Sequence, residues 1–144
     1  MIEKIKDLIK RKDMCVLATA FDNKPHCSLM AYVTDDDCGA IYMVTGRETT
    51  KYRNISANPQ VSLLIDTREE HPGDSRPKAQ ALTVSGVFEP LEDEERRQGI
   101  RTRLLERHPH LWELLEKSDA EILCIKVQSF LLLDGLSDAH YIEA

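Results

Sequence analysis

Hydroxyl and cationic side chains gather between Thr45 and Lys51, where an apolar segment meets a helical one. Apolar residues 41–44 predict a buried strand that ends at Thr45-Gly46, and residues 50–57 predict a short helix. The first amides of a helix lack backbone partners and lie at the positive end of its dipole, so anions bind there. The sequence therefore predicts an anion site, suited to a phosphate group, at this strand-to-helix junction.

Several side chains at the junction are donors that a phosphate dianion needs. They are the ammonium of Lys51, the guanidinium of Arg47 and the hydroxyls of Thr49 and Thr50. Charged donors form the stronger hydrogen bonds to phosphate, and the free amides of the helix would add to them. A second interpretation stays open, in which Thr49 is an ordinary helix cap while Lys51 and Arg53 belong to a solvated face.

Composition and charge limit the classes of protein. The chain of 144 residues predicts one domain, 1–144, and its 42% hydrophobic and 31% charged residues are typical of a globular protein. No apolar run approaches the roughly 20 residues that cross a bilayer, and the N-terminus has no signal-peptide core, so we expect a cytoplasmic protein without membrane partners. The net charge of -6 argues against binding to nucleic acid.

No sequence pattern predicts a metal centre. The four cysteines, Cys15, Cys27, Cys38 and Cys124, include no CxxC pair and have no histidine at zinc-finger spacing. Three adjacent carboxylates, Asp35 to Asp37, lack the spacing of a calcium-binding EF-hand and are better explained as a solvated turn. We expect reduced cysteines and no bound metal.

The remaining segments predict a mainly β domain with short peripheral helices. Alternating or continuous apolar residues mark the expected strands, at 15–20, 26–34, 41–44, 61–65, 79–89, 121–127 and 130–133. Helical spacing marks the expected helices, at 2–12, 50–57, 92–107 and 110–115. Because strands and helices do not alternate, the pattern favours an antiparallel sheet that closes into a barrel.

Three further features of the chain suggest where function and packing lie. The polar segment 67–78 is the longest expected loop, and its His71 and Arg76 are candidates for substrate contact, although a lone loop histidine is more often solvated. Gly86 predicts a bend or bulge within its strand. Trp112 is interpreted as a core or interface residue rather than a group that stacks on a cofactor.

The order of these segments resembles the FMN-binding split barrels related to pyridoxamine 5'-phosphate oxidase, from about residue 2 to 133. The segments that carry the resemblance are KPHCSLM, IYMVTG, ETTKYRNISANP, QVSLLI and ALTVSGVFE. It implies a split β-barrel of the antiparallel Greek-key type, with six to seven strands. It also implies a homodimer that binds FMN noncovalently at the subunit interface.

The resemblance assigns site residues by position. The FMN phosphate would be held by Thr45, Thr50 and Lys51, with Arg47 close enough to help. The strand that carries Ser28, Leu29 and Met30 would run along the ribityl chain and the isoalloxazine ring. No residue stands out as a catalytic acid or base.

Departures from the family pattern argue against vitamin B6 oxidation. Pyridoxamine 5'-phosphate oxidases have arginine where this chain has Ser28 and Thr50, lysine in place of Val33 and glutamine in place of Ala81. They also end in a segment with tryptophan and arginine, whereas residues 130–144 contain neither. Flavin binding remains the expectation.

Three functions remain open on the sequence alone. The first is an oxidoreductase in which the flavin N5 passes hydride or electrons to a small molecule, with neither substrate nor electron donor specified. The second is a flavin-binding sensor or store without turnover. The third is a haem-handling split barrel, for which the potential axial ligands are His26, His71, His108, His110 and His140.

Overall fold

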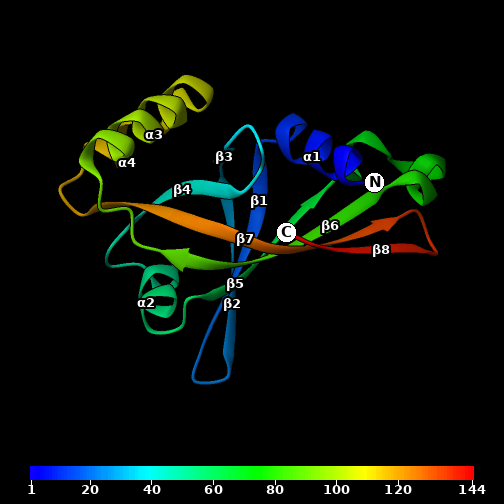
Figure 1. Cartoon of the computed structure of the whole chain (residues 1–144), viewed down its shortest axis with the longest axis horizontal. Helices are drawn as coiled ribbons and strands as arrows, with labels where there is room; N and C mark the ends of the chain where they lie inside the picture. Colours follow the sequence, from blue (N-terminus) through cyan, green and yellow to red (C-terminus); the bar gives the residue numbers. More distant parts are fainter.

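A strongly curved antiparallel sheet forms the centre of the computed structural model, which describes all residues 1–144 (Figure 1). Its strands follow the order β2-β1-β5-β6-β7-β4-β3, with β8 paired to β7. They are β1 (Met14–Phe21), β2 (Lys24–Ala31), β3 (Val33–Thr34), β4 (Ala40–Gly46), β5 (Gln60–Asp66), β6 (Gln80–Glu89), β7 (Ala120–Asp134) and β8 (Asp138–Glu143). The predicted mainly β, split-barrel fold is confirmed.

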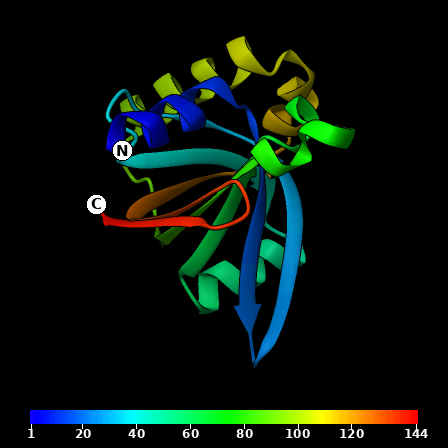
Figure 2. The same ribbon diagram turned by 90° about the vertical axis from the view of Figure 1, so that its right-hand side faces the viewer.

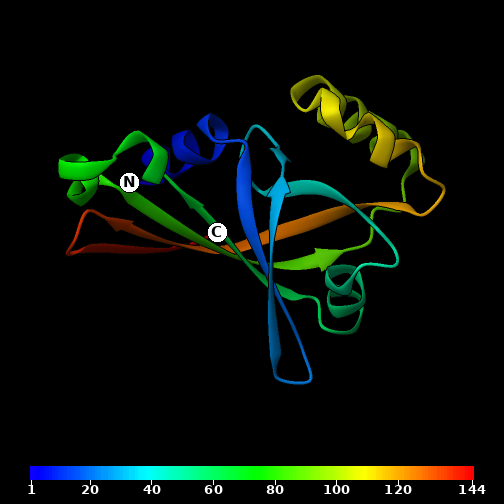
Figure 3. The ribbon, with the colours of Figure 1, turned by 180° about the vertical axis from the view of Figure 1, so that it is seen from behind.

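Short helices cover the ends of the sheet. The α-helices are α1 (Ile2–Arg11), α2 (Thr50–Ala57), α3 (Glu94–Arg107) and α4 (Trp112–Glu116). Three 3-10 turns accompany them, η1 (Arg68–Glu70), η2 (Gly73–Lys78) and η3 (Pro109–Leu111). Figures 1 and 3 show α3 and α4 at one end, with α1, η1 and η2 toward the other. Figure 2 shows β1 and β2 running side by side to a projecting turn.

The main core lies inside the curve of the sheet. Because side chains alternate along a strand, residues paired across neighbouring strands share one face. One such register row joins four core residues on β1, β5, β6 and β7, namely Leu17, Leu63, Val84 and Phe130. All four are buried, and α1 closes this core with Ile5, Leu8 and Ile9.

A second, smaller core explains why every residue of β4 is buried. Ile41 and Met43 face the main core, while Tyr42 and Val44 face a separate cluster that includes Leu104 and other residues of α3 and α4. A strand covered on both faces is apolar throughout rather than alternating. The same packing fixes α3 and α4 beside the end of β4.

The opposite face of the sheet carries a row of uncharged side chains open to solvent. In register order from β2 to β8 the row is Leu29, Val16, Leu64, Thr83, Leu131 and Tyr141. Leu29 is 72% exposed and Tyr141 is 62% exposed. We call this row the outer apolar row.

The expected bulge at Gly86 is confirmed, because the pairing of β6 with β7 shifts register between Ser85 and Gly86. A Cβ at Gly86 would lie 2.7 Å from the Lys126 carbonyl oxygen, so only glycine fits this close approach.

Two segments at the C-terminal end differ from their predictions. Segments 121–127 and 130–133 form one continuous strand, β7, because Ser129 pairs with both Ser85 and Glu143. Residues beyond Gly135 add an unpredicted strand, β8.

Trp112 is 57% exposed and so does not belong to the core.

The expected loop at 67–78 contains the two short turns η1 and η2. None of the helices is both long enough and apolar enough to cross a membrane.

Candidate functional site

A cavity of about 320 Å³ opens beside the junction of β4 and α2. It lies among segments that are far apart in the sequence, since β1, β2, β4, the start of α2 and the η3–α4 segment all contribute to it. Its lining residues are Met14, Leu29, Met30, Ala31, Val44, Thr45, Gly46, Thr49, Lys51, His110, Leu111 and Leu114. We call it the junction cavity. Its volume is at the lower end of the range typical of small-molecule sites.

Hydroxyl groups form one corner of the junction cavity. Thr49 caps α2, because its extended backbone lets its Oγ1 accept from the Tyr52 amide at 3.2 Å. The same hydroxyl donates to the Gly46 carbonyl at 2.9 Å and lies 3.1 Å from the Oγ1 of the buried Thr45. The cap therefore fixes two hydroxyls side by side.

Lys51 adds a cation to this corner without a carboxylate partner. Its Nζ donates to Thr45 Oγ1 at 3.5 Å, and it forms no ion pair. The amides of Thr50 and Lys51, in the first turn of α2, make no backbone hydrogen bond. A half-buried ammonium beside free amides attracts an anion. We call Thr45, Thr49 and Lys51, with the amide of Lys51, the anion corner.

Four of the seven residues predicted from the sequence line the junction cavity. Thr45 and Lys51 are in the anion corner, while Leu29 and Met30 form part of an apolar wall. The structure does not bring Ser28, Arg47 and Thr50 into the cavity lining.

The other three predicted residues are engaged elsewhere. Arg47 pairs with Glu121 at 2.7 Å and donates to the Ser118 carbonyl at 3.0 Å. Thr50 is exposed and lines a separate hollow beside the β1–β2 turn, together with His26. Ser28 Oγ lies 3.5 Å from the Nδ1 of the same histidine.

Sequence reasoning missed the wall formed by His110, Leu111 and Leu114. This wall is about 60 positions away along the chain from Lys51, and no short motif connects the two segments. The available signal was the Pro109 break, which starts a new turn and so redirects the chain after α3.

A chain of hydrogen bonds holds the start of this wall. His108 is buried, and its Nε2 donates to the Tyr32 carbonyl at 2.9 Å, which requires the proton on Nε2. The Tyr32 hydroxyl donates to the Ile9 carbonyl at 2.6 Å, and burial raises the pKa of this hydroxyl. The contacts therefore connect α1, the β2–β3 segment and the residue that precedes η3.

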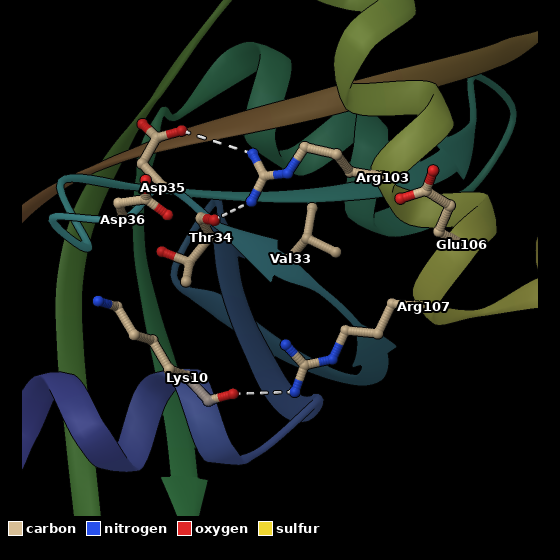
Figure 4. A pocket seen from close by; sticks show the side chains of 8 residues that line it. All are labelled: Lys10, Val33, Thr34, Asp35, Asp36, Arg103, Glu106 and Arg107. Carbon is tan, nitrogen blue, oxygen red and sulfur yellow. Dashed lines mark hydrogen bonds and ion pairs between the residues drawn. The ribbon is translucent and has the colours of Figure 1, made fainter.

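A larger open cleft of about 430 Å³ lies between α1 and α3 (Figure 4). Its arginines are already engaged. Arg103 donates to the Thr34 carbonyl and lies 3.8 Å from Asp35, and Arg107 donates to the carbonyls of Lys10 and Lys12 at 3.0 and 2.8 Å. These contacts fasten α3 to the rest of the domain, so the cleft is better explained as a clamp than as an anion site.

Another cavity, of about 520 Å³, adjoins the junction cavity, because Met14 and Leu29 line both. Both of its cations are neutralised. Lys12 pairs with Glu69 and Glu70, which lowers the pKa of both carboxyl groups, while Arg68 pairs with Asp66 at 2.7 Å. Lys51 is thus the cation in these two cavities that no carboxylate neutralises.

The cysteines do not form a reactive centre. All four are free, and burial raises the pKa of Cys15 to about 12. No group of three or more His, Cys, Asp or Glu side chains is arranged to hold a metal ion.

A curved antiparallel sheet with short helices at its ends defines a split-barrel protein. The chain belongs to the pyridoxamine 5'-phosphate oxidase family, whose model matches residues 1–133. The family resemblance predicted from the sequence is therefore confirmed.

Individual relatives are more distant. A pyridoxamine 5'-phosphate oxidase homolog from Schizosaccharomyces pombe is 34% identical over 88 residues, which are 54% of this chain and 45% of that protein. A haem-binding protein from Mycobacterium smegmatis has a TM-score of 0.86 at 18% identity, with 99% of this chain and 57% of that chain covered. An FAD-binding protein from Mesorhizobium loti has a TM-score of 0.71 at 20% identity, with 90% and 91% covered.

These comparisons differ in what they establish. The match to the yeast relative spans a little under half of that protein's length, and the mycobacterial match a little over half. At identities of 18% and 20% the two structures show the fold alone.

Proposed function

We propose that this chain binds FMN in the junction cavity and acts as an oxidoreductase on a small molecule. The observation that carries the proposal is the ammonium of Lys51, which forms no ion pair and lies beside two fixed hydroxyls at the start of α2. Such a corner suits a phosphate dianion, because the ammonium and the free amide of Lys51 can donate hydrogen bonds to it.

The residues present fit the two chemical parts of FMN. The anion corner matches the phosphate, and the apolar wall, to which Leu29, Met30 and Leu114 belong, matches a flat aromatic ring system. When bound, a flavin supplies hydride and electron transfer, which requires no acid or base from the protein. In this proposal Arg47, tied to Glu121, and the exposed Thr50 do not hold the phosphate.

We also propose that two copies of the chain associate through the outer apolar row. The row crosses the sheet from Leu29 to Tyr141 without a charged residue, which is unusual for a solvated sheet face. Leu29 belongs both to this row and to the junction cavity. A partner seated on the row would thus extend the wall of a site that one chain leaves open.

A flavin store without turnover and a haem-binding protein are the alternatives. His110 favours the second, since it is the one histidine in the lining of the junction cavity and a histidine is a common axial ligand of haem iron. A mycobacterial protein of similar fold binds haem, which makes the question worth testing.

The visible spectrum of the purified protein tests the proposal. We expect the absorption bands of an oxidised flavin, and FMN rather than FAD in the supernatant after denaturation. A Soret band that disappears in His110→Ala would instead establish haem binding. If the spectrum shows flavin, reduction by NADH or NADPH with reoxidation by an added acceptor separates an oxidoreductase from a store.

A further inference from the structure

The polar side chains of the junction cavity are unevenly distributed. Seven of its twelve lining residues are apolar, and Gly46 has no side chain. The remaining four are Thr45, Thr49 and Lys51, which are in the anion corner, and His110, which lies on the η3–α4 wall. The cavity therefore has an anion-binding end and one isolated imidazole among apolar groups.

His110 has no hydrogen-bond partner within the protein, although its ring contacts the ring of His108. It lies edge to face with the His108 ring, with centroids 5.9 Å apart and planes at 84°. His108 is itself fixed by the Tyr32 carbonyl. A fixed ring thus supports the exposed one, and both nitrogens of His110 remain available to a ligand.

We propose that His110 hydrogen-bonds the ring system of the ligand held by the anion corner. This inference rests on the proposed function and extends it. It makes the ligand a phosphate ester of a polar aromatic heterocycle, in which Lys51 recognises the phosphate and His110 the ring. Leu111 and Leu114, in the same wall, put apolar side chains beside this hydrogen bond.

A comparison of FMN with riboflavin separates the two roles, because riboflavin has the same ring and ribityl chain without the phosphate. Affinities of both ligands are measured by flavin fluorescence for the whole chain. We expect Lys51→Ala to weaken FMN binding about tenfold to a hundredfold and to leave riboflavin binding unchanged. His110→Ala should weaken both ligands by the same factor, about three- to tenfold.

Two further variants guard against an indirect effect. His110→Gln, which keeps a donor and an acceptor, should recover most of the affinity that His110→Leu loses. His71→Ala, on the loop outside the cavity, should bind both ligands as the unmodified chain does. Because His110 is exposed, the melting temperature should change little in the His110 variants.

The outcomes distinguish this inference from the proposed function. If the unmodified chain binds neither FMN nor riboflavin, the proposed function fails. If it binds both and His110→Ala leaves both affinities unchanged, or weakens FMN alone, the role of His110 is wrong while FMN binding stands.

Discussion

The Nζ of Lys51 lies 3.5 Å from the Oγ1 of Thr45, at the point where β4 ends and α2 begins. Thr45 is only 2% exposed, so its hydroxyl is held in place by the packing of β4. No carboxylate balances the ammonium, in contrast to Arg47, four residues earlier in the chain. The ammonium of Lys51 is therefore a charge that a bound anion would pair with.

Replacing Lys51 by alanine should weaken FMN binding by about 1.5 to 3 kcal/mol, the range for a charged hydrogen bond. Isothermal titration calorimetry measures the change. The matched control is Arg47→Ala, which removes a cation from the same junction but breaks the pair with Glu121 instead. An equal loss of affinity in the two variants would contradict the assignment of the phosphate to Lys51.

Replacing Thr49 by alanine should reduce the free energy of unfolding by about 1 kcal/mol, because α2 loses its N-cap. FMN affinity should also fall, since the same hydroxyl belongs to the anion corner. Thr49→Ser should keep both properties, and Thr50→Ala, at an exposed position outside the cavity, should change neither. Urea denaturation measures the stability, and a fully stable Thr49→Ala variant would rule out the capping role.

Introducing a carboxylate into the outer apolar row should separate the proposed dimer. Leu131 lies in the row between Thr83 and Tyr141 and is 37% exposed, so Leu131→Glu can fold but would bury an unpaired charge on association. Sedimentation should show a dimer for the unmodified chain and a monomer for the variant. Leu136→Glu is the control, at an 87% exposed position in the turn after β7. A monomeric unmodified chain would refute this prediction.

Local sequence accounts for the anion corner because all of its groups lie within residues 45–51 and depend on one strand end and one helix cap. The engagement of Arg47 was not predictable in this way. It depends on the pairing of β4 with β7, which puts Glu121 opposite Thr45. The His110 wall similarly depends on tertiary packing, since α3 and α4 are fixed beside β4 by a core that only the folded chain forms.

The strands, too, were predictable from local sequence only where tertiary pairing was not needed to define them. Alternation predicted where β5 and β6 run, because each has one buried face. Residues Gln128-Ser129 resembled a break in the pattern, yet Ser129 continues β7 because it pairs with strands on both sides. A polar residue in a central strand is tolerated where its side chain faces the open side of the sheet.

Alkaline pH should destabilise the domain through Tyr42. Burial, followed by the hydrogen bond to Asp35 at 2.9 Å, raises the pKa of this hydroxyl from 10.0 to about 12, although the Arg96 guanidinium opposes the shift. Between pH 10 and 12 the unfolded chain has therefore lost the phenol proton while the folded chain keeps it. The contribution of the Tyr42 phenol to the free energy of unfolding is complete below about pH 10 and is lost as the pH rises toward 12. Its upper limit is about 3 kcal/mol. Tyr42→Phe should be less stable at neutral pH, since it leaves Asp35 and Arg96 without their shared partner, but its free energy of unfolding should fall less steeply between pH 10 and 12. Parallel slopes in urea titrations at pH 9.5, 10.5 and 11.5 would show that Tyr42 is not responsible for the alkaline loss.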